Sequence, residues 1–139
     1  MQAVLHILKS AGGWHPGLSL TIDNAPYMPL VIEAMVQAGP CGFPALSVCH
    51  YSEQNDDFVR DPEMCFELGF LSGAADLNPF YWRNDYTGCE QWSRFIVGTE
   101  YAYNRELHRQ HVSFAKVWGR NLHSRGFAQA FDRQRKQAA

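Results

Sequence analysis

The feature that most constrains the fold is a repeated pattern of apolar runs that alternate with polar residues and are separated by turn residues. Two such runs, ALSVCHYSE and DFVRDPEMCFEL, flank Asn55-Asp56, and two more, PFYWRND and CEQWSRFIV, flank residues 86–88. A period of two is typical of strands, and Asn, Asp and Gly are typical of the turns between them. The pattern therefore predicts successive antiparallel hairpins.

The segments before these hairpins predict a helix and further strand. Residues 1–11 carry apolar side chains at helical spacing, and Gly12-Gly13 would stop the helix. Residues 18–23, LSLTID, alternate like a strand. Residues 29–38 fit either a short buried strand or a helix that begins after Pro29, and we favour the strand.

The C-terminal third changes to the period of a helix. Residues 104–125 predict a long amphipathic helix with Asn104 as its N-cap and Gly126 as its stop. Residues 127–139 are expected to fray into solvent. The sum is an α+β fold: an antiparallel sheet of hairpins, with an N-terminal helix and a long C-terminal helix packed on it. A length of 139 residues is that of a single domain.

The hairpin around Asn55 concentrates carboxylates in the string EQNDDFVRDPEM. Because strand residues alternate between faces, a three-residue connection would pair even positions with even positions and direct His50 and Arg60 to the core. The odd positions would then form an outward acidic row. This candidate acidic interaction face comprises Glu53, Asp57, Asp61, Glu63 and Glu67.

Three interpretations of this hairpin compete. The acidic row is either solvated or faces a partner; His50 and Arg60 form a buried polar pair; or His50 and Asp61 belong to a metal or acid-base site. The last requires ligands that converge on one point, so a histidine facing away from the carboxylates could join them only at a bulge, which Pro62 could mark. The first interpretation is favoured, and no catalytic, cofactor-binding or metal-ligating residue is assigned.

The long C-terminal helix carries a second charged surface. Its basic side chains from Arg105 to His123 fall within a narrow strip roughly 27 Å long, opposite the apolar side chains that would dock on the sheet. This candidate basic interaction face comprises Arg105, Arg109, Lys116 and Arg120. It is either an ordinary solvated helix face or a contact for phosphates, whose binding would weaken with salt and would be non-specific.

Charge is distributed unevenly along the chain. Residues 1–104 hold 4 Lys/Arg against 12 Asp/Glu, a balance of −8, whereas residues 105–139 hold 8 against 2, a balance of +6. Such an asymmetry indicates an electrostatic partner for one end, or attraction between the two ends.

Other features argue against familiar chemistry. The four cysteines have no CxxC spacing, so buried thiols in a reducing cytoplasm are favoured over disulfides or zinc. His111 is expected to be a core histidine, although His108 and His111 have a spacing that could ligate a metal. The motifs of serine hydrolases, P-loop nucleotidases, zinc proteases and dinucleotide-binding proteins are missing. No membrane span is expected.

Four strings, PYMPLVIE, HYSEQNDDFVRDPEM, FYWRNDYTG and FAKVWGRNL followed by RGF, resemble an uncharacterised family, a domain of unknown function carried on bacterial plasmids, phages and integrative elements. The resemblance spans about residues 18–127. One departure is Asn55-Asp56, where the family pattern has Asn-Gly at the hairpin tip. The resemblance implies a small accessory protein of a mobile element, but it implies no mechanism, since the family has no established catalytic residues to carry over.

The sequence therefore predicts a small cytoplasmic, non-enzymatic interaction protein with a protein partner and no cofactor. It would serve a mobile genetic element, inhibiting a host defence complex or modulating DNA maintenance through its charged surfaces. The alternatives are non-specific nucleic-acid binding through the C-terminal helix, and a metal-dependent or acid-base hydrolase around His50 and Asp61.

Overall fold

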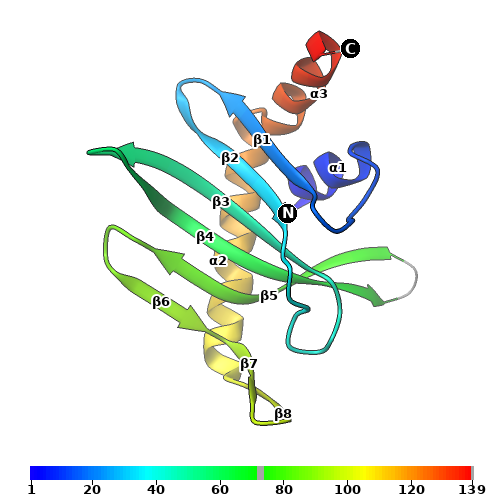
Figure 1. Ribbon diagram of the computed structural model, residues 1–139, viewed down its shortest axis with the longest axis vertical. Coiled ribbons are helices and arrows are strands. Elements are labelled where there is room, and N and C mark those ends of the chain that lie inside the picture. Colours follow the sequence, from blue (N-terminus) through cyan, green and yellow to red (C-terminus); the bar gives the residue numbers. More distant parts are fainter. Residues whose placement is uncertain (72–73, 139) are drawn as a thin grey trace.

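A computed structural model describes residues 1–71 and 74–138 and has the predicted α+β fold. Its elements, shown in Figure 1, follow in chain order: α1 (Gln2–Ser10), β1 (Ser19–Asn24), β2 (Tyr27–Ala34), β3 (Ala45–Gln54), β4 (Asp57–Leu71), β5 (Ala74–Asn84), β6 (Cys89–Trp92), β7 (Arg94–Val97), β8 (Glu100–Tyr103), α2 (Arg105–Ser124) and α3 (Phe127–Ala138). None of these helices has the length and apolar character needed to cross a membrane.

The strands form two antiparallel sheets. Strands β1 to β6 pair in chain order to make a six-stranded sheet, so each strand lies beside its neighbour in sequence, as expected for successive hairpins. Strands β7 and β8 form a separate two-stranded hairpin that projects beyond β6 (Figure 1). The preference for a strand is confirmed for residues 29–34, which belong to β2, whereas residues 35–38 lie outside any strand.

The helices pack on one face of the large sheet, with α2 running behind the strands in Figure 1. Buried side chains of all three helices join one core with alternate residues of β2, β3 and β4, such as Ile32, Val48 and Met64. Every second side chain of a strand points to the same face, and in these parts of β2, β3 and β4 the side chains that point to the helices are the even-numbered ones. None of the helices in the described residues packs on the opposite face (Figure 1).

Two local predictions at the helix ends are confirmed. The Asn104 side chain accepts a hydrogen bond from the Leu107 backbone nitrogen at 3.0 Å, which caps α2. Gly126 follows α2 with φ of 77°, a left-handed conformation that glycine adopts without a steric penalty. The end of α2 is therefore encoded locally.

The predicted three-residue connection between β3 and β4 is wrong. Gln54 pairs directly with Asp57, so the turn has two residues, Asn55 and Asp56, with φ of 51° and 67°. Both positive values are those of the hairpin turn that matches strand twist, and Asn and Asp tolerate them better than most residues. At the hairpin tip, odd positions therefore pair with even positions.

A bulge restores the predicted pairing nearer the base of the same hairpin. The register shifts between Cys49 and Tyr51, where β4 contains one extra residue around Pro62. Proline has no amide hydrogen to donate to the ladder, which suits an interruption of pairing. Beyond it Val48 pairs with Met64, even with even, as predicted.

The expectation that residues 127–139 fray is also wrong for the described part of this segment. Residues Phe127–Ala138 form α3, and Phe127, Ala130 and Phe131 are buried in the core. The reason is the turn at Gly126, which directs the apolar side of α3 toward β1 and α1.

Candidate functional site

The helix-free side of the large sheet, called here the open face, is formed by side chains that are paired across adjacent strands. Thr21 pairs with Val31, Val31 with Cys49, and Cys49 with Glu63, which continues to Arg83. Because directly paired residues share a face, these side chains lie in one row across the sheet. The open face also carries Glu33, Ser47, Tyr51, Glu53, Phe58, Arg60 and Glu90.

The structure does not bring His50 and Arg60 together. His50 is 4% exposed and lies on the core side, with its ring centroid 5.5 Å from those of Trp118 and Phe127. Arg60 pairs with Tyr51 and lies on the open face instead. The two-residue turn places Arg60 on the open face, whereas a three-residue connection would have placed it beside His50.

The predicted acidic row is likewise divided among different environments. Glu53 and Asp57 are exposed at the hairpin tip, Asp61 accepts a hydrogen bond from Asn84 at 2.8 Å, and Glu67 is 2% exposed. Glu63 accepts a hydrogen bond from the Ser47 hydroxyl at 2.6 Å. The five carboxylates therefore do not form a single outward surface, and Asp61 does not meet His50.

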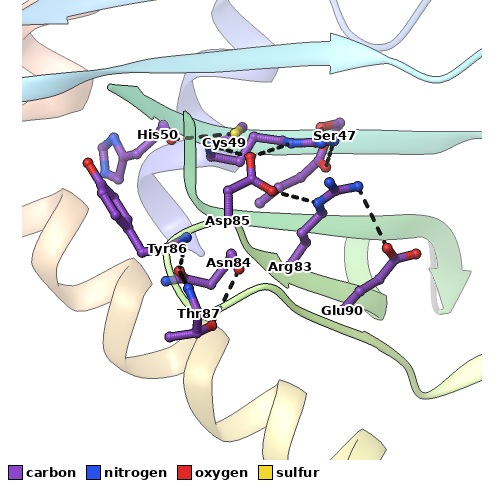
Figure 2. A network of polar contacts seen from close by, with 11 residues as sticks. Ser47, Cys49, His50, Arg83, Asn84, Asp85, Tyr86, Thr87 and Glu90 are labelled. Carbon is purple, nitrogen blue, oxygen red and sulfur yellow. Dashed lines mark hydrogen bonds and ion pairs between the residues drawn. The ribbon is translucent and has the colours of Figure 1, made fainter. Parts of the chain in front are cut away.

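A network of two arginines and three carboxylates occupies the open face of β4, β5 and β6. Asp85 lies at its centre: its carboxylate accepts from Nε of Arg83 at 2.7 Å and from Nε of Arg60 at 3.1 Å. Arg60 also contacts Glu63 at 3.3 Å, and Arg83 contacts Glu90 at 3.6 Å. Figure 2 shows Asp85, Arg83 and Glu90 in this arrangement. Both cations are therefore neutralised within the open face.

Hydrogen bonding holds Asp85 in its charged form. Burial alone would raise the pKa of Asp85, but the bonds donated by the Arg60 backbone, Arg83 and the Arg60 side chain outweigh it and lower the pKa to about 2. Asp85 therefore has no proton to donate near neutral pH. Its environment is that of a structural anion and not of a general acid.

The sulfur and phenol groups of the open face are also unreactive. Burial, followed by the nearby Glu63, raises the pKa of the Cys49 and Cys65 thiols. Burial and then Cys49 and Glu63 raise the pKa of Tyr51. Because the thiolate is the nucleophile, neutral buried thiols do not support covalent catalysis. The expectation of burial holds for Cys49 and Cys65, whereas Cys41 is exposed.

Three adjoining hollows lie on the open face. The first, of about 780 Å³, is lined by Thr21, Glu33 and Tyr51 among others. The second, of about 480 Å³, shares Glu33 and Tyr51 with it. The third, of about 710 Å³, shares Met35 with the second and reaches Trp92. Because neighbouring hollows share side chains, the three together are called here the groove; they extend over the open face from β1 and β2 to Trp92 of β6.

A buried ion pair supports the third hollow. Glu67 binds Arg94, and their side chains are 2% and 4% exposed. One Glu67 oxygen accepts from the backbone nitrogens of Cys41 and Phe43 at 2.8 and 3.0 Å, while Nε of Arg94 donates to the Tyr101 hydroxyl at 2.9 Å. The pair therefore ties residues 39–43 and the β7–β8 hairpin to the sheet. Glu67 is buried because these two segments cover it.

His108 and His111 of α2 have internal partners. His111 is 2% exposed, and its Nδ1 and Nε2 lie 2.8 and 3.1 Å from the side-chain oxygens of Ser93 and Gln91. Nε2 of His108 lies 2.8 Å from the Asn78 side-chain oxygen. His111 is thus the core histidine that was expected. Among residues 1–71 and 74–138, no three His, Cys, Asp or Glu side chains are arranged to hold a metal ion.

The candidate basic face lies on the opposite side of the molecule. All four of its residues, Arg105, Arg109, Lys116 and Arg120, are exposed on α2, while His111, Trp118 and Leu122 of the same helix are buried. Arg109 contacts Glu106 at 3.4 Å. The helix period thus predicted correctly which side of α2 faces the core.

The sequence did not single out Glu33 or Tyr51, and it did not predict the contact between Asp85 and Arg60. Asp85 meets Arg60 only because β4 and β5 are adjacent, and Glu33 and Tyr51 line the same hollows from β2 and β3. The one available signal was the alternation of side chains between the two faces of a strand, since odd-numbered residues of β2 and β3 share the face of Glu63.

Comparisons with known proteins place the chain in a family. Neither the curated proteins nor the solved structures contain a match. A family model described as "Domain of unknown function (DUF6908)" matches residues 2–128, which is most of the chain. The chain therefore belongs to the DUF6908 family.

Proposed function

We propose that this protein is a non-enzymatic interaction module that binds a protein partner through the open face of its sheet. The observation that carries this proposal is the groove of adjoining hollows on the face without helices. Exposed apolar side chains line it, with Phe58 73% and Trp92 49% exposed. Exposed aromatic side chains beside a groove are typical of binding surfaces.

The chemistry of the open face favours binding over catalysis. Asp85 is held in its charged form, and the Cys49 and Cys65 thiols are held in their neutral form. Catalytic acids, bases and nucleophiles need pKa values shifted toward neutrality, which is the opposite direction for each of these groups.

The experiment is an affinity purification with matched variants. Phe58→Ser on the open face is compared with Val117→Ser on α2, since both replace an exposed apolar side chain. We expect Phe58→Ser to lose the partner captured by the wild-type protein, and Val117→Ser to keep it. Equal capture by both variants would contradict the proposal.

We also propose that this binding serves a mobile genetic element, by inhibiting a host defence complex or modulating DNA maintenance, and that the protein works in the cytoplasm. The support is the family resemblance of the hairpin string. Inspection of neighbouring genes tests it: plasmid, phage or integrative genes are expected, and conserved housekeeping neighbours would argue against it.

A second candidate function is non-specific nucleic-acid binding by the basic face of α2. It is favoured by the exposure of Arg105, Arg109, Lys116 and Arg120 along one side of the helix. Four phosphate contacts would make the affinity fall steeply with salt. A titration with DNA and RNA at about 50 mM and 200 mM salt decides, because a lack of binding at the lower salt excludes this electrostatic mode.

A further inference from the structure

The two faces of the molecule carry opposite charge. Arg60 and Arg83, the cations of the open face, are both paired with carboxylates of that face. Glu33 and Glu53 line the groove and have no ion pair among the described residues. The cations of the last 35 residues belong to α2, α3 and the turn between them. The open face therefore has an excess of negative charge that the rest of the chain does not neutralise locally.

The groove also changes character along its length. Its β1 end is lined by Tyr51, Phe58 and the carboxylates of Glu33 and Glu53. Its β6 end is lined by Met35, Phe80, Trp92 and other apolar side chains, with Arg94 engaged beneath by Glu67. A cation is attracted to carboxylates and to the faces of aromatic rings, whereas an apolar side chain gains most from the other end.

From this complementarity we infer that the groove binds an extended segment of a partner protein that is basic at one end and apolar at the other. The basic side chains lie in the hollow formed by Tyr51, Glu33 and Glu53, and the apolar side chains lie against Trp92. The inference rests on the proposed function and specifies the partner's chemistry.

Strand geometry sets the length of this segment. Glu33 and Trp92 belong to one row of directly paired residues that runs from β2 to β6, which is four steps of about 4.8 Å, or about 19 Å. An extended chain advances about 3.3 Å per residue, so the six steps between about seven residues cover this distance. This length is short enough for a synthetic peptide to reproduce the contact.

The test is fluorescence anisotropy with labelled peptides of about seven residues. One peptide has arginines at one end and leucines at the other; the second has the leucines alone between serines; the third replaces each arginine by glutamate. We expect only the first to bind tightly, with an affinity that falls as salt is raised.

Matched charge reversals locate the contact. Glu33→Lys lies in the groove, whereas Glu106→Lys makes the same change on α2, where Glu106 is 67% exposed. We expect Glu33→Lys to weaken the basic peptide about tenfold and Glu106→Lys to leave its affinity within about twofold. Equal weakening by both, or binding of the acidic peptide, would overturn the inference.

The experiments distinguish a failure of this inference from a failure of the proposed function. If partner capture depends on Phe58 but no basic peptide binds, the open face is a binding surface for a partner of other chemistry. If neither capture nor peptide binding depends on the open face, both proposals fall. Analytical sedimentation tests whether a second copy of this chain occupies the groove in place of a partner segment. Self-association that is abolished by Glu33→Lys and also by Arg109→Glu would show that it does.

Discussion

Two carboxylates on the same side of the sheet, Glu67 and Asp85, each accept hydrogen bonds from arginine, yet their surroundings differ. Glu67 is 2% exposed beneath residues 39–43 and binds one arginine, Arg94. Asp85 is 19% exposed and lies between two arginines that reach solvent. The covered pair holds chain segments together, whereas the open network shapes a surface that a partner can reach. Burial, more than the number of ion pairs, distinguishes the two sites.

Removing Arg94 gives the sharpest test of this comparison. Arg94→Met leaves the Glu67 charge buried without its cation, so we expect the free energy of unfolding to fall by about 3 to 5 kcal/mol in urea denaturation. Adding Glu67→Gln removes the charge and should recover part of that loss. A loss below about 1 kcal/mol for Arg94→Met would place the pair among weak surface contacts.

We expect acid to reduce stability first through His111, which lies beside the buried pair of Glu67 and Arg94. Burial, followed by His108, lowers the pKa of His111 from 6.5 to about 4, and His111 contacts Ser93, the residue before Arg94. The unfolded chain therefore binds this proton more tightly, and stability falls as the pH drops from 6.5 toward 4, by up to about 3 kcal/mol. Thermal unfolding of wild type and His111→Gln measures it.

In the same measurement of stability against pH, Asp85 has its effect at lower pH than His111. Its pKa is about 2 in the fold against an ordinary value of 3.8, so its contribution is complete above pH 3.8 and is lost as the pH falls toward 2. If His111→Gln shows the same loss as wild type between pH 6.5 and 4, the assignment of that window to His111 is wrong.

A single methyl group probes the fit of residues 39–43 over Glu67. A Cβ at Gly39 would lie 2.7 Å from Cγ and Cδ of Glu67, which backbone nitrogens of Cys41 and Phe43 hold in place. Gly39→Ala should destabilise the protein by about 1 to 3 kcal/mol in denaturant titrations. Gly42→Ala is no substitute control, because Gly42 has φ of 86° and would be strained for a different reason.

The smallest effect on stability is expected in the open network. Asp85→Asn removes the central charge but leaves Arg60 and Arg83 near Glu63 and Glu90, so we expect a loss of about 1 kcal/mol. The same variant should change partner capture more than it changes stability. A loss as large as that of Arg94→Met would show that exposure does not distinguish the two sites.

Local features of the sequence predicted most of the fold. Turn residues and a period of two located the hairpins, and Asn104 and Gly126 marked the ends of α2. The β3–β4 turn was mispredicted because turn length and a bulge compensate: Asn55-Asp56 shortens the connection and the extra residue near Pro62 shifts the register back. The odd or even position of a residue cannot reveal a shortened turn and a bulge whose effects on the strand pairing cancel.

The candidate site was less accessible from the sequence because it depends on pairing between distant strands. Arg60 and Asp85 are 25 residues apart, and Glu67 and Arg94 are 27 apart. A single strand shows that Glu67 points away from the helices, but not that residues 39–43 and β7 cover it. Which carboxylates remain exposed is a property of the tertiary fold.

The most direct test of the central claim is amide hydrogen exchange of the protein alone and with its captured partner. We expect new protection in β2, β3 and residues 57–63 of β4, around Tyr51 and Glu33, with exchange in α2 unchanged. Protection confined to α2, with the open face unaffected, would contradict the central claim and assign binding to the basic helix.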